Sequence, residues 1–328
     1  MKANTHLAIT TCLILATLMQ ALDTTIANVA LPYMQGSVSA SQDEIAWVLT
    51  SYIVAAAIMT PPTGFFATRF GIKRVLLVSI CGFTIASMLC DAAQSLIQIV
   101  VFRCLQGALG AAIIPLTQTV MFNINTPERQ GRAMSTFSIA IMAAPLLGPV
   151  IGGWLTSDYS WRAVFYINMP LGILAFIGTL VFLPETKVDY HFKLDWIGFG
   201  TLSLAVGALQ ISLDRGVEQD WFSSREIITE AVLSALAFYL FLVHVFTTRK
   251  PFIRPALFSD RNFIVGTIFT TVLGTTTYAA LSLQPPFLQE LMNEPSITAG
   301  LVMGPRGLGT IFSMLVAGRV IGQVLISA

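Results

Sequence analysis

Long apolar segments separated by short polar connections run along nearly the whole chain. A helix that crosses the hydrocarbon core of a bilayer needs about 20 consecutive apolar residues. Ten segments meet or nearly meet this length: residues 7–31, 45–66, 75–95, 97–121, 133–155, 163–183, 196–213, 227–247, 262–284 and 300–318. None shows the alternation of apolar and polar residues that is typical of membrane β-barrel strands. The pattern predicts an all-α polytopic membrane protein with about ten transmembrane helices.

The connections between these segments predict how the chain lies in the membrane. Counted from the N-terminus, every second connection belongs to a set with thirteen basic residues, whereas the opposite set holds three. Cytoplasmic loops carry an excess of Lys and Arg. We therefore expect a multi-pass protein of the inner (cytoplasmic) membrane with a cytoplasmic N-terminus. The first segment is longer than a signal-peptide core and carries Asp23, so we interpret it as a retained span, with a cleaved signal peptide as the alternative.

Two polar connections divide the predicted spans into three groups. Residues 184–195 follow the sixth span, and the basic segment 248–261, which contains two prolines, follows the eighth. We predict an N-terminal six-helix bundle in residues 1–186 and a cytoplasmic connection with an inserted two-helix hairpin in residues 187–248. Residues 249–328 then form a basic linker and the first two helices of an incomplete C-terminal bundle.

Composition supports a membrane protein and excludes several other classes. The chain is 55% hydrophobic and 11% charged, whereas soluble domains carry about 25% charged residues. Its 18 basic and 17 acidic residues nearly balance, which gives no indication of a nucleic-acid partner. The four cysteines lack the spacing of metal sites or disulfides, and no catalytic constellation or phosphate-binding loop occurs. We expect no enzymatic activity, no metal site and no bound cofactor.

Asp23 is the only acidic residue well inside a predicted span. A charge there costs about 2.5–3.5 kcal/mol on insertion scales, and ionisable residues in membranes generally mark functional sites. At 1.5 Å per residue, Asp23 in the first span and Arg103 in the fourth both lie roughly 6–8 Å outside the midplane. We predict that they pair, or share a water-filled cavity, as proton and substrate coupling residues. Asn28 and Gln106 are candidate residues of the substrate cavity. The alternatives are an Asp23 that reaches interfacial water and an Arg103 that only compensates charge.

Small residues and prolines gather in the fourth and fifth spans. Gly107 lies in "GALGAAIIP", and Gly148, Pro149, Gly152 and Gly153 lie in "APLLGPVIGGW". The spacing of Gly148 and Gly152 lets helix backbones approach closely, and proline can bend a helix because it lacks a backbone N–H. We predict that these residues take part in the conformational change, with ordinary helix packing as the alternative.

The turn between the second and third spans reads "GFFATRFGIKR". Gly64 and Gly71 flank Arg69 there, which predicts a tight and specific cytoplasmic turn; basic residues that only set orientation are the alternative. The segment "WRAVFYINMP" at 161–170 opens the sixth span with aromatic residues. We expect it to anchor the span at the membrane surface and assign it no chemistry.

Together these motifs resemble the major facilitator superfamily, and within it the fourteen-span drug:proton antiporters of the EmrB/QacA type. "LDTTIANVALP" (22–32) is similar to the first-span motif of that group, and "GFFATRFGIKR" to the superfamily loop between spans two and three. "RCLQGALGAA" (103–112) resembles the fourth-span motif and "GPVIGG" (148–153) the antiporter motif of span five. "WRAVFYINMP" followed by "PET" (184–186) resembles the sixth span of the subgroup. One departure is Thr68, which stands where the superfamily loop often has aspartate.

The resemblance implies a major facilitator fold of which about ten of fourteen helices are present, so we expect the chain to be C-terminally truncated. It also implies export of hydrophobic drugs or toxic compounds by alternating access, with the proton gradient as the energy source. Implied partners are hydrophobic small molecules, protons and the lipid bilayer, and in a Gram-negative source also a periplasmic adaptor and an outer-membrane channel. A solute importer or facilitator of the same superfamily and a non-transporting membrane fragment are the alternatives.

Overall fold

A computed structural model describes residues 3–248, 251 and 253–292, and also positions 305, 309, 312, 313 and 316. Helices form this part of the chain almost completely, and no strand occurs in it. The α-helices are α1 (Ala3–Val38), α2 (Gln42–Met59), α3 (Thr63–Phe70), α4 (Ile72–Ala92), α5 (Leu96–Gly110), α6 (Ile113–Ile124), α7 (Pro127–Asp158), α8 (Ala163–Tyr166), α9 (Asn168–Phe182), α10 (Trp196–Arg215), α11 (Arg225–Thr247) and α12 (Arg261–Pro286). Short 3₁₀ turns (Trp221–Ser223 and Pro255–Ser259) and a π-helical turn (Phe287–Leu291) complete the elements.

Eight of the ten predicted spans have a counterpart among helices that are long and apolar enough to cross a membrane. Seven segments meet this description directly, and an eighth does so if α2 and α3, which meet at a 55° bend, are taken as one span. The bend falls at Pro61 and Pro62, which cannot donate backbone hydrogen bonds. The ninth predicted span corresponds to α12, and the tenth, residues 300–318, falls almost entirely outside the described residues.

Polar residues at the ends of the apolar segments explain where several helices begin. Ser41 and Glu44 form a reciprocal capping box at the start of α2, with Glu44 N donating to Ser41 Oγ and Ser41 N donating to Glu44 Oε2. Asp195 accepts from Gly198 N at the start of α10, and Ser224 accepts from Glu226 N at the start of α11. Such caps satisfy backbone N–H groups that have no partner within the helix.

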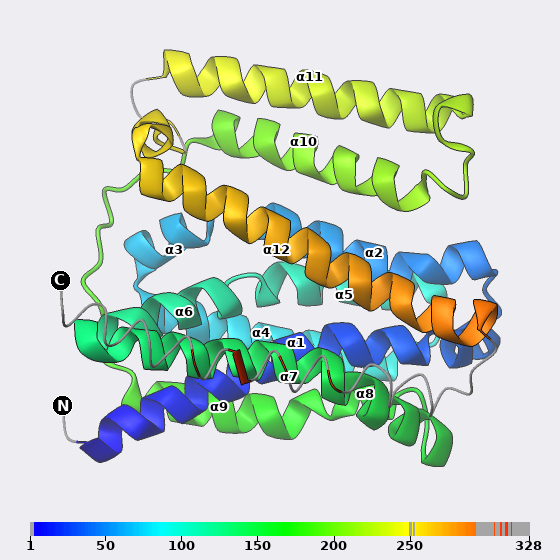
Figure 1. The fold of residues 1–328 in the computed structure, drawn as a ribbon, viewed down its shortest axis with the longest axis horizontal. Helices are drawn as coiled ribbons and strands as arrows, with labels where there is room; N and C mark the ends of the chain where they lie inside the picture. The colour runs from blue at the N-terminus through cyan, green and yellow to red at the C-terminus, as the bar shows by residue number, and fades with distance from the viewer. Residues whose placement is uncertain are drawn as a thin grey trace.

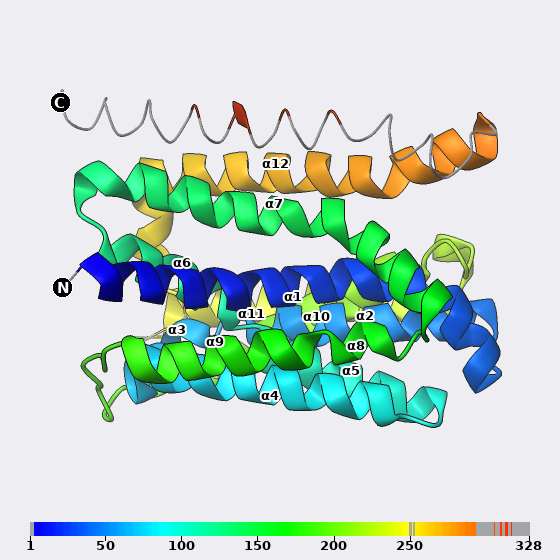
Figure 2. The ribbon, with the colours of Figure 1, turned by 90° about the horizontal axis from the view of Figure 1, so that it is seen from below.

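The first nine helices form one bundle around α1. In Figure 2, α1 lies between α7 on one side and α9 on the other, and α4 and α5 close the side below α9. Packing on several sides buries a continuous series of apolar side chains along α1: Ile9, Leu13, Ala16, Met19, Ile26, Ala30 and Met34. The bundle therefore holds the middle of α1, where Asp23 is located, away from its outer surface.

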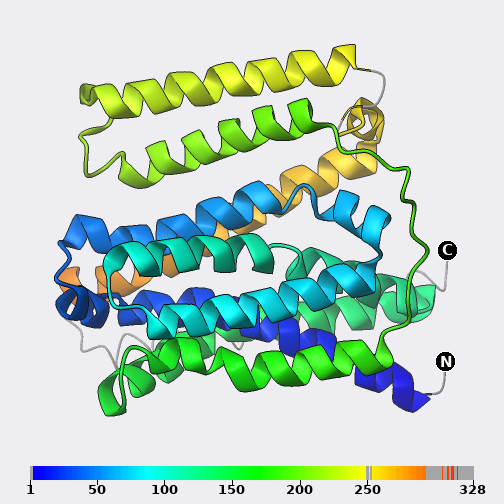
Figure 3. The same ribbon diagram turned by 180° about the vertical axis from the view of Figure 1, so that it is seen from behind.

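The hairpin α10–α11 forms an outer layer against α2, as Figures 1 and 3 show. Ser234 Oγ of α11 donates to the Ala205 carbonyl of α10 across 2.8 Å, and Thr50 of α2 donates to the Asp214 carboxylate of α10. Large apolar side chains of α11 point outward, among them Val232, Leu236, Tyr239 and Phe246. An exposed apolar surface of this extent suits contact with lipid.

Successive connections alternate between the two ends of the bundle. The α1–α2 and α10–α11 connections lie at one end in Figure 1, whereas α3, the long connection into α10 and the turn before α12 lie at the other. This alternation agrees with the division of the connections into two sets, whereas the prediction that one end lies in the cytoplasm stays a prediction. The described side chains of α12 are nearly all exposed, so this helix is little covered by the bundle.

Candidate functional site

Asp23 lies in the buried interior of the bundle, with only 1% of its surface exposed. Its neighbours Leu22 and Ile26 on α1 are also buried, as is Arg103 on α5, which is fully enclosed. A buried charge is strongly unfavourable unless it is paired and hydrogen-bonded. The surroundings of Asp23 must therefore supply those bonds.

Arg103 supplies the positive charge. Its Nη1 donates to Asp23 Oδ2 across 2.6 Å and to Gln106 Oε1 across 2.8 Å. Its Nε donates to the Val48 carbonyl oxygen of α2 across 3.1 Å, and its guanidinium lies over the Tyr52 ring with 4.3 Å between Cζ and the ring centroid. These contacts fix the guanidinium between α1, α2 and α5. Asp23 and Arg103 are thus in direct contact, as the depth of the two residues indicated.

The second carboxylate oxygen is held by two side-chain amides. Gln106 Nε2 donates to Asp23 Oδ1 across 2.9 Å, and Asn168 Nδ2 of α9 donates to the same oxygen across 2.7 Å. Asn168 Nδ2 also donates to Ser87 Oγ of α4 across 2.9 Å, and Ser87 in turn donates to the Phe165 carbonyl oxygen across 2.9 Å. The side chains of Asp23, Gln106, Asn168 and Ser87 are all buried.

This arrangement has a definite chemical capacity. Asp23 accepts hydrogen bonds from three donors on two other helices, which is the environment of an ionised carboxylate. Taking up a proton would turn one of these oxygens into a donor that faces another donor, and the network would have to rearrange. The site can therefore link the protonation of Asp23 to the positions of α1, α4, α5 and α9.

Gly107, Gly148 and Gly152 lie at close helix contacts. A Cβ atom on Gly107 would overlap the Tyr52 carbonyl oxygen and lie 3.0 Å from its carbonyl carbon, so this glycine lets α5 approach α2 beside the network. A Cβ on Gly148 would overlap Thr25 Oγ1, and one on Gly152 would lie 3.3 Å from the Ile26 carbonyl oxygen. Gly148 and Gly152 thus let α7 pack closely on α1 at Thr25 and Ile26, just after Asp23.

The other two candidates of the fifth-span motif face elsewhere. A Cβ added to Gly153 would meet nothing within 4 Å, and Pro149 is exposed. The motif therefore has one face that packs on α1 and another that is not covered by the described residues. Its predicted role in the conformational change stays a prediction.

The turn between α3 and α4 is covered by the connection that follows α9. Gly71 has φ +88°, a left-handed conformation that favours glycine, and a Cβ there would lie 3.2 Å from Val188 Cγ1. Arg69 Nη1 donates to the Phe192 carbonyl oxygen across 3.0 Å. Gly64, by contrast, has open space around it. Arg69 and Gly71 thus hold the 184–195 connection against this turn.

Thr68 takes part in the same contact through its backbone. Its carbonyl oxygen accepts from Asp189 N across 2.9 Å, while its hydroxyl donates to the Gly64 carbonyl oxygen across 2.8 Å. Ile72 N, at the start of α4, donates to Thr186 Oγ1 across 2.8 Å. The position where the superfamily loop often has aspartate is therefore joined to the connection by one backbone hydrogen bond.

Asn168 is a member of the network that sequence reasoning missed. The sequence assigns no chemistry to 161–170, but Asn168 in that segment contacts Asp23. The signal was available, because Asn168 lies five residues before the centre of the sixth span, which runs in the same direction as the fourth, and so has roughly the depth assigned to Asp23 and Arg103. Asn28 is exposed and takes no part in the network, so its assignment to a substrate cavity stays a prediction.

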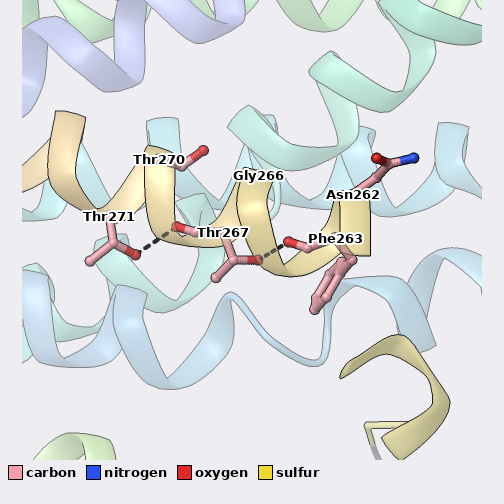
Figure 4. A pocket seen from close by; sticks show the side chains of 6 residues that line it. All are labelled: Asn262, Phe263, Gly266, Thr267, Thr270 and Thr271. Carbon is pink, nitrogen blue, oxygen red and sulfur yellow. Dashed lines mark hydrogen bonds between the residues drawn. The ribbon is translucent and has the colours of Figure 1, made fainter. Parts of the chain in front are cut away.

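One hollow among the described residues lies on α12, away from Asp23. Its volume is about 460 Å³, and Figure 4 shows the side chains that line it: Asn262, Phe263, Gly266, Thr267, Thr270 and Thr271. The threonine hydroxyls bond to their own helix, Thr267 to the Phe263 carbonyl and Thr271 to that of Thr267. With no ionisable group and a single helix for its wall, this hollow gives no basis for a site. No group of three or more potential metal ligands occurs in the described part of the chain.

Comparison with known proteins identifies the family. The model of the Major Facilitator Superfamily matches residues 13–325. The chain is 39% identical over 312 residues to the multidrug export protein EmrB of Haemophilus influenzae, covering 95% of this chain and 61% of that protein. It is 37% identical to EmrB of Escherichia coli K12, covering 94% and 61%, and 38% identical to the fatty acid resistance protein FarB of Neisseria gonorrhoeae, covering 95% and 62%. The chain thus spans about three fifths of the length of these curated relatives.

Solved structures agree on the fold. The proton:xylose symporter XylE, bound to 6-bromo-6-deoxy-D-glucose, matches with a TM-score of 0.64 at 15% identity, over 98% of this chain and 70% of that one. A mutant of the peptide transporter POT in complex with sulfate matches with a TM-score of 0.55 at 15% identity, over 73% and 52%. The resemblance to EmrB-type exporters and the all-α major facilitator fold are both confirmed. The chain therefore belongs to the major facilitator superfamily, as a multi-pass membrane protein.

Proposed function

We propose that this chain belongs to a secondary active exporter that moves hydrophobic compounds out across the inner membrane in exchange for protons. The observation that carries the proposal is the buried carboxylate of Asp23, held by Arg103, Gln106 and Asn168. In an alternating-access cycle, rocking of the two bundles changes the access of a central group to water on each side. Asp23 would take up a proton from outside and release it inside, and Arg103 would set how readily it does so.

The names of the relatives support export as the direction of transport. EmrB proteins are named for multidrug export and FarB for fatty acid resistance. For this protein we propose neutral or anionic hydrophobic compounds as substrates. The reason is that Asp23 is already neutralised by Arg103 and so offers no free negative charge to a cationic compound.

The topology and the partners follow from the same proposal. An N-terminus on the cytoplasmic side puts the basic connections inside, in line with the positive-inside rule. If the source is a Gram-negative bacterium, a periplasmic adaptor and an outer-membrane channel would carry the compound onward. No nucleic-acid partner is proposed.

The test is proton-driven dye transport into everted membrane vesicles that contain the full-length gene product. Asp23→Asn keeps the size of the side chain and removes its ionisation, so we expect proton-coupled transport to be lost. Glu230→Gln is the matched control, because it neutralises a carboxyl of α11 outside the network. Transport by Asp23→Asn at the unmodified rate would contradict the proposal.

Two further arms separate the rival functions. An exporter lowers dye accumulation only in energised cells, whereas a facilitator equilibrates the dye with or without a gradient. Expression of residues 1–328 alone tests whether this part of the protein transports by itself. Drug resistance from that chain would exclude an inert fragment.

A further inference from the structure

Asn168 is the first residue of α9, directly after the one-residue break at Ile167 in the sixth span. Helix α8 ends at Tyr166 and α9 begins at Asn168, and Pro170, which lacks an N–H, cannot bond to the Tyr166 carbonyl four residues earlier. Helix interruptions inside transporter bundles often lie beside the groups that bind ions or substrate. Here the interruption brings the side chain of Asn168, which is fully buried, to the carboxylate of Asp23.

The direction of each hydrogen bond around Asn168 is fixed by chemistry. An ionised carboxylate can only accept, so Asn168 must present its Nδ2 to Asp23 Oδ1, 2.7 Å away. The second hydrogen of that nitrogen goes to Ser87 Oγ at 2.9 Å, which leaves the Ser87 hydroxyl to donate to the Phe165 carbonyl oxygen at 2.9 Å. The chain of bonds runs from Asp23 to the backbone of α8.

Gln106 and Asn168 differ in how firmly their amides are held. The oxygen of Gln106 accepts from Arg103 Nη1 at 2.8 Å and lies 3.9 Å from the Cys90 thiol, which donates to it. The oxygen of Asn168 is buried and has no hydrogen-bond partner among the described residues. Rotation of the Gln106 amide would break its bond to Arg103, whereas rotation of the Asn168 amide would break no bond made by its oxygen.

We propose that Asn168 is a positioning residue that follows the protonation of Asp23 by rotating its amide. With Asp23 ionised, Nδ2 donates to the carboxylate. When a proton from water binds Oδ1 and the carboxylate charge becomes zero, the amide turns, and Oδ1 of Asn168 accepts from the new hydroxyl. Ser87 then donates to the same amide oxygen and releases the Phe165 carbonyl, so that protonation alters the junction of α8 and α9. This inference rests on the proposed coupling role of Asp23.

Few other groups could account for a change with pH at this place. The titratable and charged groups around Asp23 are Arg103 of α5, Tyr52 of α2 and Cys90 of α4. Helix α9 contains no titratable or charged residue. The charged residues of α7 lie in its first two turns and at its last residue. Tyr166 of α8 is exposed.

The test is infrared difference spectroscopy of the full-length protein in lipid nanodiscs, titrated with acid and labelled with isotopic asparagine. The carbonyl band of a protonated carboxyl that is absent in Asp23→Asn reports Asp23. Asn168→Leu removes one hydrogen bond to the charged form, so we expect this band to appear at a pH about one unit higher. The labelled amide band that changes together with it should be lost in the same variant. Thr179→Val, which alters another buried polar residue of α9, should leave both bands unchanged.

The outcomes separate this inference from the proposed function. An Asp23 band that titrates identically in Asn168→Leu and in the unmodified protein would overturn the role of Asn168. If Asn168→Leu does not fold, Ser87→Ala decides, because the inference requires the labelled amide band to change in that variant and an unchanged band overturns it. Retained proton coupling in Asp23→Asn would defeat the proposed function alone, since the infrared bands report the network whether or not it drives transport.

Discussion

Asp23 and Arg103 are 80 residues apart in sequence, yet Arg103 Nη1 lies 2.6 Å from Asp23 Oδ2 in a region where neither side chain reaches solvent. A buried ion pair is poor evidence for stability in itself, because the cost of taking both charges out of water offsets much of their attraction. Its value here is that the carboxylate is hydrogen-bonded to side chains from two other packed helices. A change at the carboxylate would therefore act on all of these helices.

Arg103→Ala should destabilise the protein strongly. Removing one partner of a buried pair leaves the other charge uncompensated, which typically costs about 3–5 kcal/mol. The double variant Asp23→Asn with Arg103→Gln should lose much less stability, because neither position then buries a charge. Unfolding of the purified protein in lipid or mild detergent measures the difference.

The control for Arg103 is Arg215→Ala, at the C-terminal end of α10. Arg215 pairs with Glu226 at a partly exposed position, and such pairs contribute about 0–1 kcal/mol. Equal losses of stability from the two variants would show that the network around Asp23 does not hold a buried charge.

Gly148→Ala should impair the packing of α7 on α1. The added Cβ would overlap Thr25 Oγ1 and lie 2.7 Å from Thr25 Cβ, only two residues after Asp23. Overpacking of this kind costs typically about 1–3 kcal/mol and shifts the backbone. We expect lower stability and lower transport, measured by thermal unfolding and dye efflux.

Gly153→Ala is the matched control on the same helix, because nothing lies within 4 Å of the added atom. If that variant unfolds as readily as Gly148→Ala, the loss arises from the motif as a whole and not from the contact with Thr25.

Gly71→Ala should loosen the 184–195 connection. Its φ of +88° is strained for alanine, and the new Cβ would press on Val188 and Thr186 at 3.2 and 3.3 Å. Backbone amides of the 184–195 connection should then exchange hydrogen faster. Hydrogen–deuterium exchange followed by mass spectrometry measures this directly.

Gly64→Ala changes the other glycine of the same motif, in the first turn of α3, where the added atom meets open space. Exchange in residues 184–195 should be unaltered in this variant. Faster exchange in both would mean that the turn responds to any substitution and does not hold the connection through Gly71.

Much of this architecture could be predicted from the sequence because the membrane imposes it. A spanning helix must be long and apolar, so segment lengths were sufficient to predict eight of the ten spans among the described residues. Depth alone was enough to predict that Asp23 and Arg103 meet. The first and fourth spans run in opposite directions, so a residue shortly after the centre of one has the same depth as a residue equally far before the centre of the other.

Rotation about each helix axis was not predictable in the same way. Asn28 and Asp23 are five residues apart on α1, but one is exposed and the other buried. Gly152 and Gly153 are neighbours, yet only the first meets another helix. Which face packs depends on all the neighbours at once, and for this reason Asn168 and Ser87 became recognisable only in the folded bundle.

The central claim is that Asp23 is the group whose proton is exchanged for substrate. Its most direct test is the proton released into weakly buffered solution when a hydrophobic substrate is added to the purified full-length protein, with binding followed in parallel. We predict release from the unmodified protein and none from Asp23→Asn, which still binds the compound. Equal proton release from Asp23→Asn would contradict the account.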